Sequence, residues 1–145
     1  MNIRRFAKIL SIDLDSDYSV MIHVKLTGQL IYRGSKLKSD KLSNKVIGGL
    51  GGKHTHLIFH LNNGDLYYND VRQFGWVRVL KSQAIDAVQV PEPLKDLTLA
   101  KFQSILTKTK RAIKIVLMDQ TKIGGVGNIY ATDALWLAKI SPRTT

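Results

Sequence analysis

The segment best suited to chemistry is a glycine-rich turn late in the chain. Gly125-Val126-Gly127-Asn128 precedes a stretch with helical spacing, and glycines let a backbone turn tightly and approach a ligand closely. The exposed N–H groups of a helix N-terminus favour an anion such as phosphate. Asn128 would either cap the helix or donate its amide to a phosphate oxygen. The turn is thus a candidate grip on a nucleic-acid backbone, or else only a tight connection. A basic run without an intervening acid lies upstream: Lys101, Lys108, Lys110, Arg111 and Lys114.

A second candidate is the segment from Asn69 to Trp76, which follows a strand-like stretch. An aromatic side chain such as Phe74 can wedge between stacked bases, while an arginine two residues earlier, Arg72, hydrogen-bonds the base left without a partner. The alternative interpretation is that Phe74 and Trp76 belong to the core and Arg72 is solvated.

Two further segments carry weaker signals. His23 stands near the end of a strand-like stretch, where it would bind a phosphate or be buried against the backbone, and Leu26 would form an exposed apolar tip. Arg4-Arg5-Phe6-Ala7-Lys8 is typical of a solvated basic chain end.

His54-Thr55-His56 resembles a metal pair, but no nearby acid completes a ligand set and the chain has no cysteine, so we predict no metal site.

Composition and charge favour a polyanionic partner. The chain of 145 residues has 22 Lys and Arg against 11 Asp and Glu, a net charge of +11, and 44% hydrophobic residues. That hydrophobic content suits a folded core, and no apolar run approaches the roughly 20 residues that span a bilayer. Nucleic acid is the first candidate partner, an anionic membrane surface the second, and a charge that serves only solubility the third.

The elements that would position these residues change along the chain. Period-two alternation predicts strands over 9–14, 18–24, 56–61, 66–69 and 75–80, with Asn63-Gly64 at the centre of a type I′ hairpin turn. Residues 33–53 read as a basic loop. After Pro91-Glu92-Pro93 the spacing becomes helical, with helices expected over 97–106, 112–119 and 128–139. The pattern predicts an α+β fold, with an antiparallel β domain followed by a small helical one.

Read together, the segments resemble one family, the Fpg/Nei DNA glycosylases (formamidopyrimidine type). Arg4 to Leu10 is similar to the family's Arg-Arg-x-Lys-Tyr-Leu segment, and Ile22 to Leu30 is similar to its Ile-His-Leu-Gly-Met-Ser-Gly segment. Lys53 to His56 resembles Lys-His-Asp-His, and Tyr68 to Gly75 resembles Tyr-Asn-Asp-Pro-Arg-Arg-Phe-Gly. Pro91 to Leu94 matches as it stands, and Ala112 to Ala131 resembles the helix-two-turn-helix signature. The matches occur in the family's order and cover nearly the whole chain.

The resemblance implies a fold, a partner and residue roles. The fold would be an incomplete antiparallel β-sandwich over residues 1–94 followed by a helix-two-turn-helix domain over 95–145, with double-stranded DNA carrying a damaged or abasic site between them. Lys8, His23 and Asn128 would hold phosphates, supported by Lys114 and Gly127. Leu26, Arg72 and Phe74 would fill the void left by a flipped-out nucleotide. Leu26 replaces the usual Met, and Val71 and Gln73 replace the usual Pro and second Arg.

The resemblance also implies chemistry that this chain does not carry. Family members begin with Pro-Glu, whose proline amine attacks the sugar, whereas this chain begins Met1-Asn2 and has no cysteine for the family's zinc finger. We therefore expect the DNA-binding middle of a bacterial, cytoplasmic, nucleoid-associated glycosylase/AP lyase for oxidised purines, truncated at both ends and without a cofactor. No catalytic residue is assigned, except Lys8 as an auxiliary amine.

Two alternatives to the glycosylase hypothesis stay open. The first is a non-catalytic protein that binds damaged DNA, and the second is a basic RNA-associated domain. In each case we expect no membrane partner and a monomer, with self-association through exposed strand edges.

Overall fold

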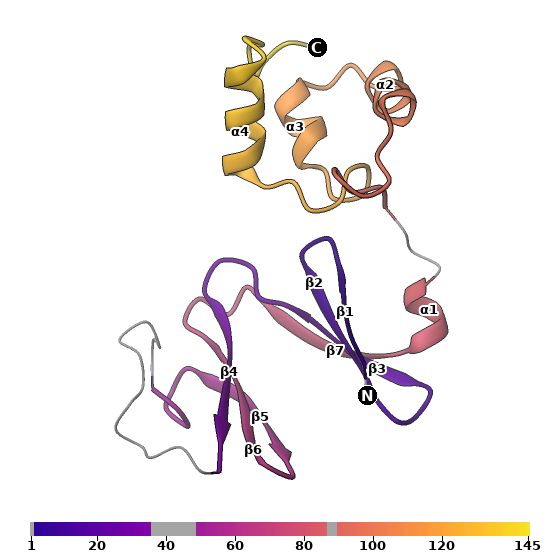
Figure 1. Ribbon diagram of the computed structural model, residues 1–145. Helices are drawn as coiled ribbons and strands as arrows, with labels where there is room; N and C mark the ends of the chain where they lie inside the picture. Colours follow the sequence, from indigo (N-terminus) through magenta and orange to yellow (C-terminus); the bar gives the residue numbers. More distant parts are fainter. Residues whose placement is uncertain (1, 36–48, 87–89) are drawn as a thin grey trace.

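The chain folds into a β-rich part followed by a helical part (Figure 1). The computed structural model describes residues 2–35, 49–86 and 90–145. The strands are β1 (Asn2–Phe6), β2 (Ile9–Asp13), β3 (Tyr18–His23), β4 (Gly28–Gly34), β5 (Thr55–Leu61), β6 (Gly64–Asp70) and β7 (Trp76–Lys81). The helices are α1 (Ser82–Asp86), α2 (Leu99–Thr107), α3 (Ile113–Met118) and α4 (Asn128–Leu137).

The strands form two antiparallel sheets. One has the order β1-β2-β3-β7 and the other the order β4-β6-β5. The core between them centres on Val20 and Ile22 from the first sheet and Tyr68 from the second, each at most 7% exposed. The partly buried residues packed against this centre are Leu10, Ile12, Val24, Leu30, Phe59 and Val77. The predicted α+β class, with antiparallel sheets ahead of helices, is confirmed.

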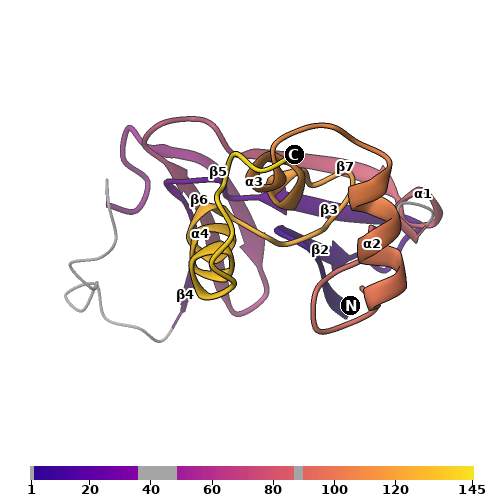
Figure 2. The same ribbon diagram turned by 90° about the horizontal axis from the view of Figure 1, so that it is seen from above.

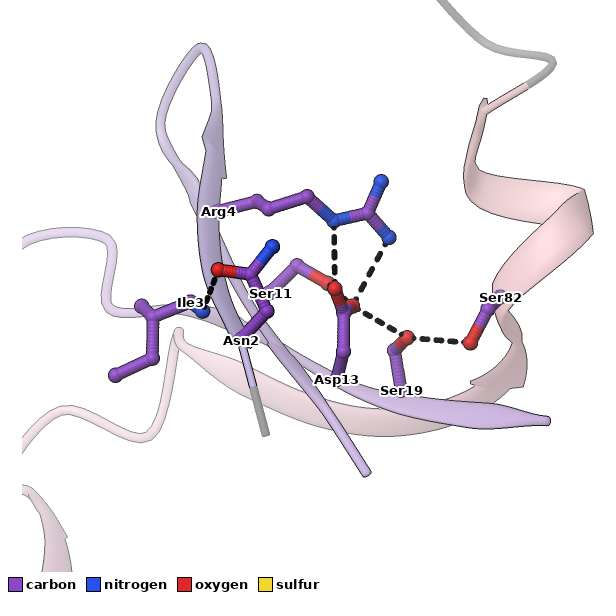
Figure 3. A network of polar contacts seen from close by, with 7 residues as sticks. All are labelled: Asn2, Ile3, Arg4, Ser11, Asp13, Ser19 and Ser82. Carbon is purple, nitrogen blue, oxygen red and sulfur yellow. Dashed lines mark hydrogen bonds and ion pairs between the residues drawn. The ribbon is translucent and has the colours of Figure 1, made fainter. Parts of the chain in front are cut away.

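The basic start of the chain is a strand, so its prediction as a solvated end is wrong. Arg4 Nη2 donates to Asp13 Oδ1 at 2.9 Å, and Arg4 Nε lies 2.8 Å from Asp13 Oδ2 (Figure 3). Ser19 donates to the same carboxylate at 2.8 Å and also bonds Ser82 at the start of α1. Hydrogen bonds from Arg4 and Ser19 lower the pKa of Asp13. Arg4, which looks solvated in the sequence, therefore joins β1 to β2, and Asp13 in turn joins β2 to β3 through Ser19.

The predicted hairpin exists, but its turn differs from the prediction. Leu61 pairs with Gly64, which places Asn62 and Asn63 at the tip and makes Gly64 the first residue of β6. Of these tip and flanking residues only Gly64 has a positive φ, +145°. A type I′ turn centred on Asn63-Gly64 is therefore wrong. A side chain on Gly64 would collide with the carbonyl of Arg33 in β4, which accounts for glycine there.

Other differences are additions rather than contradictions. Strand β4 and helix α1 were not predicted, because residues 28–34 alternate weakly and α1 is only five residues long. Of the predicted basic loop over 33–53, Arg33 and Gly34 belong to β4, while residues 36–48 lie outside the described residues.

The three predicted helices are present. The views in Figures 1 and 2 agree in placing α3 between α2 and α4. Thr98 caps α2 by accepting the N–H of Lys101 at 3.3 Å. Val116, Ile123 and Ala131 are 0% exposed and lie in the interior of this part. None of the helices in the described ranges is long and apolar enough to cross a membrane.

Candidate nucleic-acid interface

The carboxylate of Asp70, at the end of β6, organises two neighbouring loops. It accepts a hydrogen bond from the Thr27 hydroxyl at 2.5 Å, and it accepts the N–H groups of Gly75 and Arg72 at 2.8 and 3.3 Å. The Arg72 N–H also donates to Thr27 Oγ1 at 3.1 Å. Burial alone would raise the pKa of Asp70, but these hydrogen bonds, with one from the Gln73 N–H, lower it below its ordinary value. A buried anion thus fixes both loops.

Those two loops carry three predicted site residues. Leu26 is 72% exposed and Phe74 is 55% exposed, and the Arg72 guanidinium lies 4.8 Å from the centre of the Phe74 ring. Lys25 and Gln73 have positive φ, 50° and 56°, so each loop makes a sharp bend beside its exposed apolar residue. The structure therefore brings Leu26, Arg72 and Phe74 to one edge. The alternative in which Phe74 belongs to the core does not fit its exposure.

Lys8 and His23 form a second group on the same part of the molecule. Lys8 Nζ donates to the carbonyl of Val126 at 2.8 Å, which places the amine beside Gly127. His23 Nδ1 accepts the N–H of Lys25 at 3.0 Å, so the neutral ring carries its proton on Nε2. Burial and the neighbouring Lys25 lower the pKa of Lys8, and burial, Lys25 and Lys8 lower that of His23. A nearby anion would relieve this mutual repulsion.

A cavity of about 260 Å³ lies where the strands meet the later part of the chain. Lys8, His23 and Trp76 line it from the strands, and Glu92 and Gln120 line it from the later part. The centres of the Trp76 and His23 rings lie 5.9 Å apart. The cavity combines apolar side chains with the cations of Lys8 and Lys25 and the carboxylates of Glu92 and Asp96.

The glycine turn before α4 is closed by Gln120. Its Oε1 accepts the N–H of Gly125 at 3.0 Å, and its Nε2 donates to the Val126 carbonyl at 2.7 Å. Gly125 has a φ of 87°, which favours glycine. Gly127 is the N-cap of α4, without a side-chain cap, and exposed Asn128 is the first helical residue. The prediction that Asn128 caps the helix is therefore wrong. The other prediction, that its amide donates to a phosphate oxygen, remains.

The structure does not bring every predicted residue to this cavity. Lys114 lies in the first turn of α3, and its ammonium makes no hydrogen bond or ion pair within the described ranges. In the upstream basic run, Arg111 pairs with Asp119 at 3.0 Å and Lys101 donates to the Asp96 carbonyl at 3.0 Å. These two cations hold the helical part together as well as adding to its positive field.

One ring of the predicted histidine pair is held by the backbone. His56 Nε2 bonds the carbonyl of Asp70 at 2.7 Å, and the part of the chain with described coordinates contains no group of three or more potential metal-ligating side chains. The chain also has no cysteine. A thiolate-ligated zinc therefore does not fit the residues present.

Sequence reasoning missed three residues that shape the interface: Asp70, Glu92 and Gln120. Asp70 had a readable signal, since an Asp ahead of a short loop often accepts hydrogen bonds from backbone N–H groups two residues on. Glu92 had none, because the residues that donate to its side chain lie more than 80 positions away in the sequence. The partners of Gln120 in the glycine turn lie only five and six positions away, but no sequence pattern marked it.

Two models of one protein family match the chain. The formamidopyrimidine-DNA glycosylase N-terminal domain matches residues 1–77, and the formamidopyrimidine-DNA glycosylase H2TH domain matches residues 90–145. The chain belongs to the formamidopyrimidine-DNA glycosylase family. The resemblance drawn from the sequence segments is confirmed.

Individual relatives agree with this assignment. The formamidopyrimidine-DNA glycosylase of Chloroflexus aurantiacus is 39% identical over 147 residues, which cover 98% of this chain and 49% of the relative. A MutM structure in complex with DNA containing carbocyclic 8-oxo-G matches with a TM-score of 0.78 and 29% identity, over 98% of this chain and 52% of that one. A complex of the Lactococcus lactis Fpg with abasic-site DNA matches with a TM-score of 0.77 and 29% identity, over 98% and 50%. The chain spans about half the length of the relatives it matches.

The Asp70 contacts predict how stability depends on this carboxylate. Asp70→Asn places an NH₂ group among N–H and O–H donors, so we expect it to lower the free energy of unfolding at pH 7 by about 1–3 kcal/mol. Because the folded-state pKa is lowered, the stabilisation is complete above the ordinary aspartate pKa of about 3.9 and is lost as pH falls through the folded value. Urea unfolding from pH 7 down to pH 3 would show the gap between wild type and variant narrowing only below about pH 4.

A matched control comes from the same strand. Asp65 pairs with His60 at 2.8 Å, but both side chains are more than a third exposed, so Asp65→Asn should change stability by less than about 1 kcal/mol. Equal losses in the two variants would contradict the role given to Asp70.

Proposed function

We propose that this chain is the DNA-binding portion of a base-excision DNA glycosylase/AP lyase that acts on oxidised purines in duplex DNA, in the bacterial cytoplasm at the nucleoid. The observation behind the proposal is the exposed trio of Leu26, Arg72 and Phe74, held on two loops by the buried carboxylate of Asp70. Exposing two large apolar side chains on rigid loops is unfavourable in water, and it is typical of residues that insert into a partner.

Each member of the trio has a distinct role in the proposal. Phe74 enters the stack at the damaged position, and Arg72 hydrogen-bonds the base left without a partner. Leu26 fills the remaining space from the neighbouring loop, where its volume is close to that of the usual methionine. Unstacking costs a few kcal/mol and is least at a damaged or abasic position, so the trio selects such positions.

The remaining site residues hold the sugar-phosphate backbone. Lys8, His23 and Asn128 bind the phosphates around the flipped nucleotide, with the backbone of Gly127 offering a close approach. Lys114 binds the backbone from α3 and adds to a positive field supplied by the net charge of +11. The curated relatives named formamidopyrimidine-DNA glycosylases and the Lactococcus lactis complex with abasic-site DNA support this assignment.

Binding to an abasic duplex tests the proposal. We expect this chain to bind duplex DNA with a stable abasic-site analogue more tightly than the same undamaged duplex, and both affinities to fall as salt rises from about 50 to 200 mM. Arg72→Ala should remove about 1–3 kcal/mol of the preference, because it leaves the unpaired base without a partner. Asn128→Ala should weaken binding to the abasic duplex. Fluorescence anisotropy with labelled duplexes measures the affinity of wild type and of each variant for both duplexes.

Arg78→Ala is the matched control for Arg72→Ala. Arg78 also lies over an aromatic ring, 4.8 Å from the centre of Trp76, so its loss removes the same charge and the same kind of contact. It should weaken binding to both duplexes alike and leave the preference unchanged. Equal, salt-sensitive binding of wild type to both duplexes would instead indicate a general nucleic-acid-binding protein.

The position of Lys8 supports an auxiliary lyase role for its amine. Its Nζ lies at the Val126 carbonyl beside the cavity, and its lowered pKa increases the neutral fraction that can act as a nucleophile. The amine would add to the aldehyde carbon of a ring-opened abasic sugar and lose water to form an imine. Loss of the C2′ proton to solvent then expels the 3′ phosphate, and hydrolysis of the imine returns the amine.

Borohydride reduction would trap that imine. We expect slow formation of a covalent adduct between wild type and a duplex with a natural abasic site, with the adduct mapped to Lys8 by mass spectrometry. Lys8→Arg keeps the positive charge but has no primary amine that can form the imine, so it should lose the adduct while still binding the duplex. Either the absence of any adduct or an undiminished adduct in Lys8→Arg would reject this role.

A further inference from the structure

Glu92 joins the turn between β1 and β2 to the segment that leads into the helices. The residue is only 7% exposed. Its side chain accepts hydrogen bonds from Arg5 Nη1, near the end of β1, at 2.6 Å and from the N–H of Ala7, in the turn, at 2.8 Å. Its own N–H donates to Asp96 Oδ1 at 2.8 Å, and its carbonyl accepts the N–H of Leu97 at 3.1 Å. The residue is therefore fixed at both its backbone and its side chain.

The turn that Glu92 clamps has an unusual backbone and leads directly to Lys8. Ala7 has a φ of 52°, a region that residues with a side chain rarely adopt. Gly124 packs so closely that an added side-chain carbon would lie 3.1 Å from both Ala7 Cβ and Glu92 Cγ. The Gly124 N–H donates to the Pro91 carbonyl at 2.9 Å, which ties the loop before α4 to the same place.

We infer that Glu92 is a positioning residue that sets the place of Lys8 against the Val126–Gly127 turn, and so holds the two halves of the proposed phosphate grip at their working distance. This inference rests on the proposed function. Glu92 acts through Ala7 and Arg5 rather than by touching the DNA: its two oxygens hold the turn from Arg5 to Ala7, and the next residue, Lys8, then reaches the Val126 carbonyl at 2.8 Å.

The clamp is electrostatic and persists across neutral pH. Burial would raise the pKa of Glu92, but the hydrogen bonds from Arg5 and Ala7, with the charges of Arg5 and Lys95, lower it below its ordinary value. The side chain is thus a carboxylate wherever the protein binds DNA. A neutral amide of the same shape would present NH₂ to the Arg5 guanidinium or to the Ala7 N–H, and one of the two contacts must then be lost.

The chain offers a matched control in a second arginine–carboxylate pair of β1. Arg4 pairs with Asp13 at 2.8 Å, as Arg5 pairs with Glu92 at 2.6 Å, but the Asp13 pair joins strands to one another and does not contact the turn that carries Lys8. Figure 3 shows the Asp13 carboxylate directed toward Arg4 and Ser19. Asp13→Asn therefore removes a comparable charge pair without releasing Lys8.

The test is a double-mutant cycle between Glu92→Gln and Lys8→Ala, read as the preference for abasic-analogue over undamaged duplex. We expect each single variant to reduce the preference, Glu92→Gln by about fivefold, and the double variant to be no worse than Lys8→Ala alone, because both changes remove the same contact. Glu92→Asp, which keeps the charge on a shorter side chain, should recover part of the loss. Asp13→Asn should leave the preference unchanged even where it lowers the melting temperature.

A second readout needs no DNA and separates this inference from the proposed function. An NMR titration of the Lys8 side-chain ammonium should show its pKa rising toward the ordinary value in Glu92→Gln but not in Asp13→Asn, because a released turn exposes the amine to water. Additive losses in the cycle, or an unchanged Lys8 pKa in folded Glu92→Gln, would overturn the inference. Wild type that binds both duplexes equally would overturn the proposed function, whatever the titration shows.

Discussion

The interface depends on one buried negative charge. Taking a carboxylate out of water is costly unless hydrogen-bond donors replace the solvent, and Asp70 obtains those donors from two loops at once. Neither loop can move away without leaving the charge unpaired. The loops are thereby rigid enough to keep Leu26 and Phe74 in water, where loose loops would fold such side chains inward. A polar contact beneath the surface thus maintains an apolar edge above it.

Glu92 applies the same principle at the junction between strands and helices. It is also a carboxylate with little exposure, and its donors come from a turn with a left-handed residue. Asp70 therefore shapes the loops that would enter the duplex, and Glu92 aligns the cations that would hold the DNA backbone. The chain has only 11 acidic residues against 22 basic ones, and Asp70 and Glu92 are two of those acids with a structural role.

Local patterns predicted most elements but not the contacts that align them. Alternation of apolar residues marked β2, β3 and β5, and helical spacing marked α2 to α4, because each signal lies within a few residues. Strand β1 looked like a solvated end, since Asp13 and Glu92 neutralise its arginines only after folding. The exposed trio was predicted from the family resemblance, whereas Asp70 and Thr27, 43 positions apart, meet only through sheet pairing.

Asp70 holds the loop that carries Phe74 in the shape that we propose enters DNA. The most direct measurement is the fluorescence of 2-aminopurine placed next to the unpaired base of an abasic-analogue duplex, at saturating protein. We expect wild type to raise the fluorescence by unstacking the probe, Phe74→Ala to abolish the rise, and Asp70→Asn, folded and bound, to reduce it strongly. A rise of the same size in Asp70→Asn and wild type would show that Asp70 does not set the shape of this loop.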